Sequence, residues 1–275
     1  MTPPRDILFL SHGAPSLLTG RSQARRYLEG LGPVLSGARA VAAVSAHWES
    51  RPVKVTTAAR SRTVHDFRGF GDALARFQWP APGAPDLAHA LADGLRQEGV
   101  EAAGDPGRGF DHGVWVPLAL ALPAAQTPVI QVSLPARDED DAAARRLGAA
   151  LGGLAARLDL QLVFSGALTH SLHDALAAPE AAPAADFARA FNDWAAERLR
   201  RGDMEGLARW RAAPQARRNH PTPEHLRPLL AAQAAAGGAP GVRRHASFTH
   251  AALAMDVWSF PGRSKTARSS ERSAA

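Results

Sequence analysis

Five histidines stand where their side chains could act together. They follow short apolar runs or lie in loops rich in glycine or proline: His12, His47, His112, His170 and His225. Neutral imidazole is a good ligand for Fe(II), Zn, Cu and Ni. Because the chain has no cysteine, any bound metal must be held by His, Asp or Glu side chains. The histidines therefore indicate a metal site, in which three protein ligands would leave positions open for substrate, water or oxygen.

The residue types do not determine which metal would bind. Non-haem Fe(II) oxygenases commonly use two His and one carboxylate, whereas catalytic zinc can be held by three His. None of the His pairs has the H-E-x-x-H spacing of zinc proteases. Iron-dependent oxygenation and zinc-dependent hydrolysis are thus both compatible with the histidines.

Short apolar runs alternate with Ala-rich stretches, and this pattern predicts the elements that position the histidines. Strands are expected at 7–10, 40–46, 53–58, 128–134, 160–165, 243–248 and 253–260. Helices are expected at 21–31, 70–77, 85–98, 116–121, 138–158, 184–200, 204–211 and 223–236. The alternation predicts an α/β fold, a single domain with a largely parallel central sheet flanked by helices. Ligands of such sheets bind beyond the carboxyl ends of the strands, where His12, His47 and His170 fall.

The chain is predicted to form one catalytic domain. Its 275 residues are within the range of a single α/β unit, and we find no internal repeat or clear linker. We expect the domain to span residues 1–261. Residues 262–275 are rich in Ser, Arg and Ala, which predicts a disordered tail.

Charge and hydropathy exclude some classes of partner. The net charge is +6, but the basic residues are interleaved with acidic ones and form no stripe with aromatics, so we expect no nucleic-acid partner. No apolar run approaches the ~20 residues of a membrane span, and no signal peptide is recognisable. We therefore predict a cytoplasmic protein that does not bind membranes; the sequence leaves its oligomeric state open.

Seven segments, in order along the chain, carry a specific resemblance. They read FLSHGAP at 9–15, VSAHW at 44–48, VHDFRGF at 64–70, WPAPG at 79–83, GFDHGVW at 109–115, SGALTH at 165–170 and NHPTPEHLRPL at 219–229. Together they resemble the class III extradiol ring-cleavage dioxygenases and, within that superfamily, the 4,5-DOPA dioxygenase extradiol group. The resemblance extends from Ile7 to about Phe260.

The resemblance implies an Fe(II) site made by His12, His47 and His225, in which Zn(II) can replace iron in purified protein. The wider superfamily has a glutamate as third ligand, so the adjacent Glu224 is an alternative. Consecutive residues of a helix point about 100° apart, and both are therefore not expected to bind one metal. We favour His225.

The resemblance also implies roles for the other polar residues. His170 matches the acid/base histidine, and His112 matches a histidine beside substrate and oxygen. His65 and Asp66 are expected to contact the substrate. The implied reaction inserts O2 into a DOPA-like catechol and opens its ring. Ala14, Ala167 and Ser171 stand where the family commonly has Ser, Asn and Asn, which bears on the identity of the catechol.

Two other functions are compatible with this fold. A zinc-dependent hydrolase would use the same ligands but would need no oxygen. A non-enzymatic binding protein similar to Memo would be expected to have a damaged histidine set, whereas the set here is complete.

Overall fold

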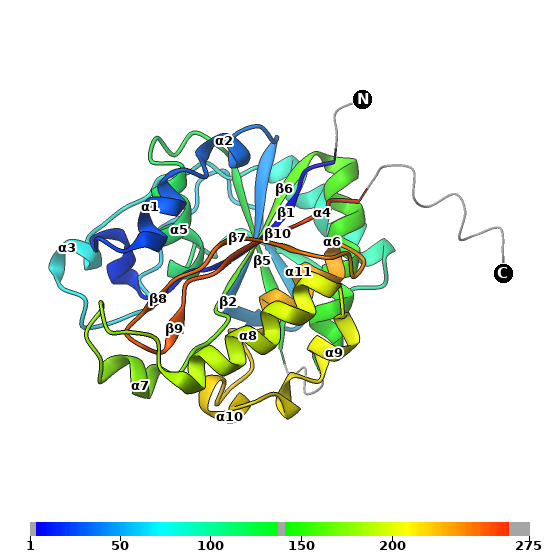
Figure 1. The fold of residues 1–275 in the computed structure, drawn as a ribbon. Coiled ribbons are helices and arrows are strands. Elements are labelled where there is room, and N and C mark those ends of the chain that lie inside the picture. The colour runs from blue at the N-terminus through cyan, green and yellow to red at the C-terminus, as the bar shows by residue number, and fades with distance from the viewer. Residues whose placement is uncertain (1–3, 137–140, 264–275) are drawn as a thin grey trace.

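The computed structural model describes residues 4–136 and 141–263. Within these ranges an eight-stranded sheet lies between two layers of helices, as Figure 1 shows. The strands of this sheet are β1 (Ile7–Ser11), β2 (Ala40–Ser50), β3 (Val53–Thr56), β4 (Ala102–Asp105), β5 (Val129–Pro135), β6 (Leu160–Gly166), β7 (Val242–His245) and β10 (Val257–Phe260). A small second sheet pairs β8 (Phe248–Thr249) with β9 (Leu253–Ala254).

The helices of the described ranges vary from single turns to long amphipathic elements. They are η1 (Pro15–Leu18), α1 (Gln23–Glu29), α2 (Gly32–Leu35), α3 (Asp72–Ala75), α4 (Pro85–Gln97), α5 (His112–Ala121), α6 (Ala142–Leu158), α7 (Leu172–Leu176), α8 (Asp186–Arg201), α9 (Met204–Ala208), η2 (Trp210–Ala212), α10 (Ala216–Asn219) and α11 (Arg227–Ala235). The predicted tail at 262–275 lies outside the described residues from position 264 onward.

The middle of the large sheet is parallel. Its order is β4-β3-β5-β2-β6-β1-β10-β7, and the neighbours β5, β2, β6 and β1 all run in the same direction. At one edge β10 and β7 pair antiparallel, and near the other edge β3 is antiparallel to β5. The predicted α/β fold with a largely parallel sheet is therefore confirmed.

Alternate residues of the strands face the two helical layers. In β1, Ile7 and Phe9 belong to the core that includes residues of α4, α6 and α11, whereas Leu8 and Leu10 face the core that includes residues of α1 and α5. This follows from the period of two in strand side chains. Because both faces of the central strands are covered, these strands are mostly apolar.

Three element boundaries differ from the predictions at the histidines. β2 does not end at residue 46 but continues to Ser50, so His47 lies inside the strand. Its pairing with β5 is irregular between Val44 and Glu49, which is where His47 lies, and such irregularities re-aim side chains. The helix expected at 116–121 begins four residues earlier, so that His112 is its first residue rather than part of a loop.

The third difference concerns His225, which was expected inside a helix beginning at residue 223. It lies in a turn, and α11 begins two residues later at Arg227. Pro228 at the second helical position explains this start, because proline is suited to the first turn of a helix.

The strand β4 was not predicted at all, because its sequence AAGD lacks the β-branched residues typical of strands.

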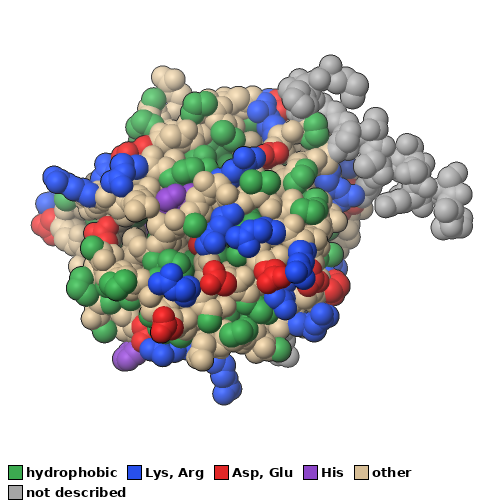
Figure 2. Space-filling model, in the orientation of Figure 1, with side chains coloured by type: hydrophobic (Ala, Val, Ile, Leu, Met, Phe, Trp, Pro, Cys, Tyr) green, Lys and Arg blue, Asp and Glu red, His purple; other side chains and the backbone are tan. Residues whose placement is uncertain are grey.

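Among the described residues, no helix has the length and apolar character needed to cross a membrane. On the face seen in Figure 2, Lys and Arg side chains are interspersed with Asp and Glu.

Candidate metal centre and active site

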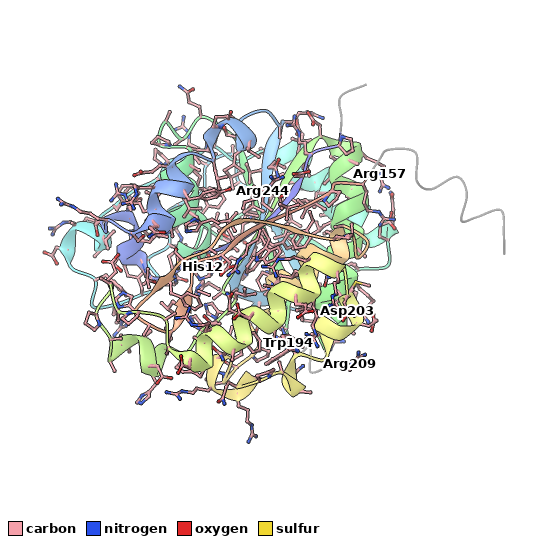
Figure 3. All side chains as sticks on the ribbon, viewed as in Figure 1. His12, Arg157, Trp194, Asp203, Arg209 and Arg244 are labelled. Carbon is pink, nitrogen blue, oxygen red and sulfur yellow. The ribbon has the colours of Figure 1, made fainter. Side chains whose placement is uncertain are left out.

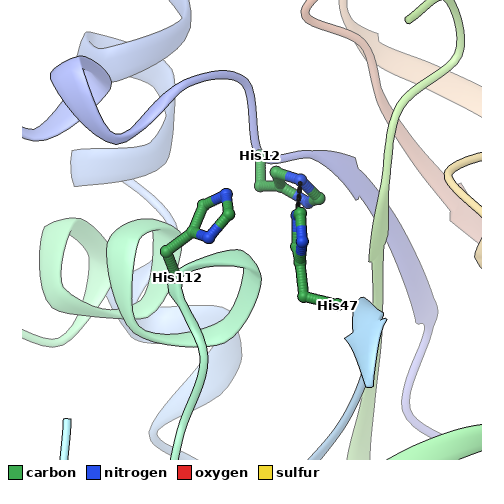
Figure 4. Close-up of side chains that lie close together, drawn as sticks. All are labelled: His12, His47 and His112. Carbon is green, nitrogen blue, oxygen red and sulfur yellow. Dashed lines mark hydrogen bonds between the residues drawn. The ribbon is translucent and has the colours of Figure 1, made fainter. Parts of the chain in front are cut away.

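Histidines from separate parts of the chain meet near the carboxyl ends of the parallel strands. His12 directly follows β1, His47 lies near the end of β2, and His112 begins α5, as Figure 4 shows. His225 comes from the turn before α11, and His170 from the loop between β6 and α7. In Figure 3, His12 lies among the side chains near the middle of the molecule, and it is only 2% exposed.

Three of these histidines turn the same ring atom toward one point. The Nε2 atom of His47 lies 3.0 Å from Nε2 of His12 and 3.3 Å from Nε2 of His225. Nitrogens bound to one metal at about 2.0–2.1 Å are separated by distances of this size. The three residues that the sequence nominated as ligands are therefore brought together.

The opposite ring nitrogens decide which of these Nε2 atoms carry lone pairs. Nδ1 of His225 lies 2.9 Å from a carboxylate oxygen of Glu224, which can only accept, so Nδ1 carries the proton. Nδ1 of His12 lies 3.0 Å from Oγ of Ser165, whose own hydroxyl donates to the carbonyl of Gly113. His12 Nδ1 therefore also donates, and Nε2 is unprotonated in both rings.

Two lone pairs thus face His47 Nε2, which could donate a single proton to only one of them. A cation between the three nitrogens would satisfy all of them, so the donor set fits a divalent metal that accepts imidazole, such as Fe(II) or Zn(II). A hydrogen-bonding partner at Nδ1 orients the ring of a histidine that binds metal through Nε2, and Ser165 and Glu224 are such partners for His12 and His225.

Burial keeps these imidazoles neutral. Burial, together with the neighbouring His112, lowers the pKa of His47 to about 3, although Asp66 opposes the shift. Burial and the adjacent histidines also lower the pKa values of His12 and His225 well below 6.5. Unprotonated imidazole is the form that binds metals, so the site is ready to do so at neutral pH.

His112 and His170 lie on either side of this group. The ring of His112 is centred 3.9 Å from that of His47, and the ring of His170 stacks on His225 at 3.4 Å with an interplanar angle of 12°. Burial, with a contribution from His220, lowers the pKa of His170 to about 3. Both residues predicted to be catalytic therefore lie next to the proposed ligands.

Side chains that could bind a metal form two sets, and within each set the possible ligand atoms lie within 4.8 Å of one another. One contains His12, His47 and His112, and the other contains His170, Glu224 and His225. In the first set, Nδ1 of His112 is already bonded to a carboxylate of Asp66 at 2.8 Å. The mutual approach of the Nε2 atoms is what favours His225 as third ligand.

The expectation that Glu224 and His225 are neighbours within a helix is wrong. The two residues lie in a turn, so the 100° separation of helical neighbours does not apply to them. Instead, the Glu224 carboxylate accepts from Nδ1 of His225 and from the hydroxyl of Thr222. Through the contact with Nδ1, Glu224 supports the orientation of the His225 ring.

The predicted substrate residues lie beside the site. His65 has its Nε2 2.9 Å from the carbonyl oxygen of Phe77, and its ring packs near Phe67 and Trp115. Asp66 faces His112 and His47. Substrate contact by His65 and Asp66 stays a prediction.

The sequence did not single out the buried residues that hold these histidines. Ser165 contacts Nδ1 of His12, and Asp111, the residue before His112, is fully buried and accepts from Ser45 and Gln131. Burial raises the pKa of Asp111, a shift that its hydrogen bonds oppose. Ser165 and Asp111 both lie inside motifs that carry the resemblance, but a single Ser or Asp in such a motif is too common to indicate this role.

Known proteins that resemble this chain agree on its family. Residues 9–255 match the family described as "Catalytic LigB subunit of aromatic ring-opening dioxygenase". The chain is 34% identical over 238 residues to the 4,5-DOPA dioxygenase extradiol of Beta vulgaris, an alignment that covers 85% of this chain and 87% of that protein. It is 34% identical over 228 residues to the Escherichia coli K12 protein of the same name, covering 81% and 82%.

Two further relatives extend the comparison. Dioxygenase tasH of Hapsidospora irregularis is 32% identical over 263 residues, covering 91% of this chain and 76% of that protein. The crystal structure of an uncharacterized Escherichia coli K12 protein superposes with a TM-score of 0.76 at 28% identity, covering 93% of this chain and 99% of the other. The chain therefore belongs to the LigB family of class III extradiol dioxygenases, oxidoreductases that open aromatic rings with incorporation of O2.

Proposed function

We propose that this enzyme opens the ring of a DOPA-like catechol at a mononuclear Fe(II) site held by His12, His47 and His225. His170 is the acid/base residue, His112 acts beside the reacting oxygen, and His65 and Asp66 adjoin the substrate. The observation that carries the proposal is the approach of three Nε2 atoms within 3.0 and 3.3 Å, two of which carry lone pairs.

The bound iron would supply the redox chemistry and the positive charge that lowers the pKa of a catechol hydroxyl. The chain supplies geometry and proton transfer. Neutral His170 lies against the ligand His225, where its ring can take a proton from a hydroxyl of the substrate. Because Nδ1 of His112 is held by Asp66, its Nε2 is the ring atom free to face oxygen and substrate.

Aromatic side chains support a planar, apolar substrate. The ring of Phe67 lies edge-on to His112 at 5.7 Å and 6.0 Å from Trp115. Such a wall would pack against an aromatic ring whose hydroxyls are turned to the histidines. DOPA is the catechol that the names of several relatives specify, and it is the first substrate to try.

The test is anaerobic loading of the full chain with Fe(II), followed by L-DOPA and then air. We expect a new visible absorbance from the ring-opened product only when iron, catechol and oxygen are all present. Zn(II)-loaded protein is the matched control and should give no product. Bound iron without product from L-DOPA or simple catechols would contradict the proposal, and oxygen-independent hydrolysis by the zinc form would favour the hydrolase.

A further inference from the structure

The carboxylate of Asp66 lies between the rings of two active-site histidines. Its Oδ1 accepts from the backbone nitrogen of His112 at 3.1 Å and from Nδ1 of the same residue at 2.8 Å. Its Oδ2 lies 3.7 Å from Nδ1 of His47. One carboxylate thus faces the Nδ1 atoms of a proposed ligand and of a proposed proton-handling residue.

This arrangement determines where the ring protons lie. An ionised carboxylate has no hydrogen to give, so the Nδ1 atom that bonds to it must be the donor. Nε2 of His112 is then unprotonated in the neutral ring, and the negative charge favours the same tautomer in His47. Both rings consequently turn an acceptor nitrogen toward the place where metal and substrate meet.

Asp66 also fixes His112 relative to its helix. The residue at the N-cap of α5 is Asp111, but its side chain makes no capping bond there. The Asp111 carboxylate is occupied below the helix by Ser45 and Gln131. Asp66, which comes from a segment distant in sequence, accepts a hydrogen bond from the backbone N–H of His112, the first residue of α5. Its Oδ1 atom therefore holds both the backbone and the ring of His112.

We propose that Asp66 is a positioning residue that sets the tautomer of His112 and orients His47 for metal binding. This role goes beyond substrate contact and rests on the proposed metal site. It also links the segment that carries Phe67 to the histidines, because Asp66 and Phe67 are adjacent and both contact His112.

Two substitutions at this position are expected to act differently. In Asp66→Ala, His112 loses its hydrogen-bond acceptor, and His47 loses the carboxylate charge that lies 3.7 Å from its Nδ1. In Asp66→Asn the single amide oxygen can still accept from His112, but the NH2 group then faces the Nδ1–H of His47, donor against donor. Asp66→Asn should therefore keep the tautomer of His112 but disturb the orientation of His47, whereas Asp66→Ala should affect both.

The experiment uses the full-length Zn(II)-loaded protein and needs no turnover. Long-range 1H–15N NMR spectra report the tautomer of His112, and competition with a chelator gives the Kd for Zn(II). For Asp66→Ala we expect His112 to lose its single Nδ1–H form and the Kd to rise roughly 10- to 100-fold, as for other second-shell changes. For Asp66→Asn we expect a similar rise in Kd while His112 keeps its tautomer.

Asp105→Asn is the matched control. Asp105 is also a carboxylate that accepts backbone N–H groups, from Gly107 and Arg108, but it pairs with Lys54 rather than with a histidine. It should change neither readout. An unchanged His112 tautomer and a Kd within about twofold of wild type in Asp66→Ala would overturn the proposal, as would equal effects of Asp105→Asn. A wild-type enzyme that binds Zn(II) but opens no catechol when loaded with Fe(II) would count against the proposed function and leave this test intact.

Discussion

His225 and Glu224 are adjacent, but they are expected to respond to substitution in different ways. His225 directs Nε2 at His47, so His225→Ala should remove a ligand and abolish metal retention. Glu224 contacts only Nδ1 of His225 within this group, so Glu224→Gln should keep the metal and weaken its binding by roughly 10- to 100-fold.

Metal content per chain after dialysis, measured by atomic emission, distinguishes the two. His89→Ala is a matched control, since His89 is exposed on α4 and its loss should leave the metal in place. Full loss of metal from Glu224→Gln with retention in His225→Ala would show that the carboxylate is the ligand.

The identities of the site residues could be predicted, but the atoms that they use could not. Sequence motifs nominated His12, His47 and His225, and the structure brings their Nε2 atoms together. The choice of nitrogen depends on the partner of Nδ1. For His225 that partner is the neighbouring Glu224. For His12 and His112 the partners, Ser165 and Asp66, come from distant parts of the chain. No local pattern predicts such pairings.

The elements that carry the site are held in place by a close helix contact behind the sheet. Gly152 in α6 lies so near α11 that a Cβ atom there would clash with the carbonyl of Ala235. Gly152→Ala is therefore expected to destabilise the protein by about 1–3 kcal/mol through overpacking. The midpoint of urea unfolding would measure this change.

Gly153, the next residue of α6, is the control for that substitution. A Cβ atom there would meet only the end of the Arg157 side chain, at 4.0 Å. Gly153→Ala should be neutral or should stabilise the helix by up to about 1 kcal/mol, because alanine is the better helix former. Similar losses in both variants would mean that the helix contact is not the cause.

The sequence predicted elements well where the pattern was strong and poorly at their ends. The buried strands β1, β5 and β6 lie where apolar runs placed them. The end of β2 was placed too early because the expected strand stopped at the polar residue His47, whereas pairing with β5 carries the strand to Ser50. Tertiary pairing of this kind leaves no local signal.

Across the whole molecule, a buried ion-pair network connects the sheet to the helices behind the site. Arg227 bonds to Glu49 at 2.6 Å and to Asp141 at 3.0 Å, and Asp141 also accepts from Trp210 and Arg211. Glu49 and Arg227 each lie two residues beyond a proposed ligand, His47 and His225 respectively. The network therefore holds two ligand-bearing segments against each other.

Arg227→Met is expected to destabilise the fold by about 3 kcal/mol, because it removes a partner from the fully buried carboxylate of Asp141. Urea unfolding of the metal-free protein would measure the loss. Arg217→Met, at an exposed position of α10, is the control and should stay within about 0.5 kcal/mol of wild type. An Arg227 variant as stable as the control would show that the network contributes nothing net.

The position of β1 has a consequence for biosynthesis. β1 lies between β6 and β10, and β10 is the final strand of the described chain. During translation, β1 therefore has no strand to pair with until β6 has been synthesised. His12 must likewise wait for His225, so the proposed metal site can form only after both segments have been synthesised.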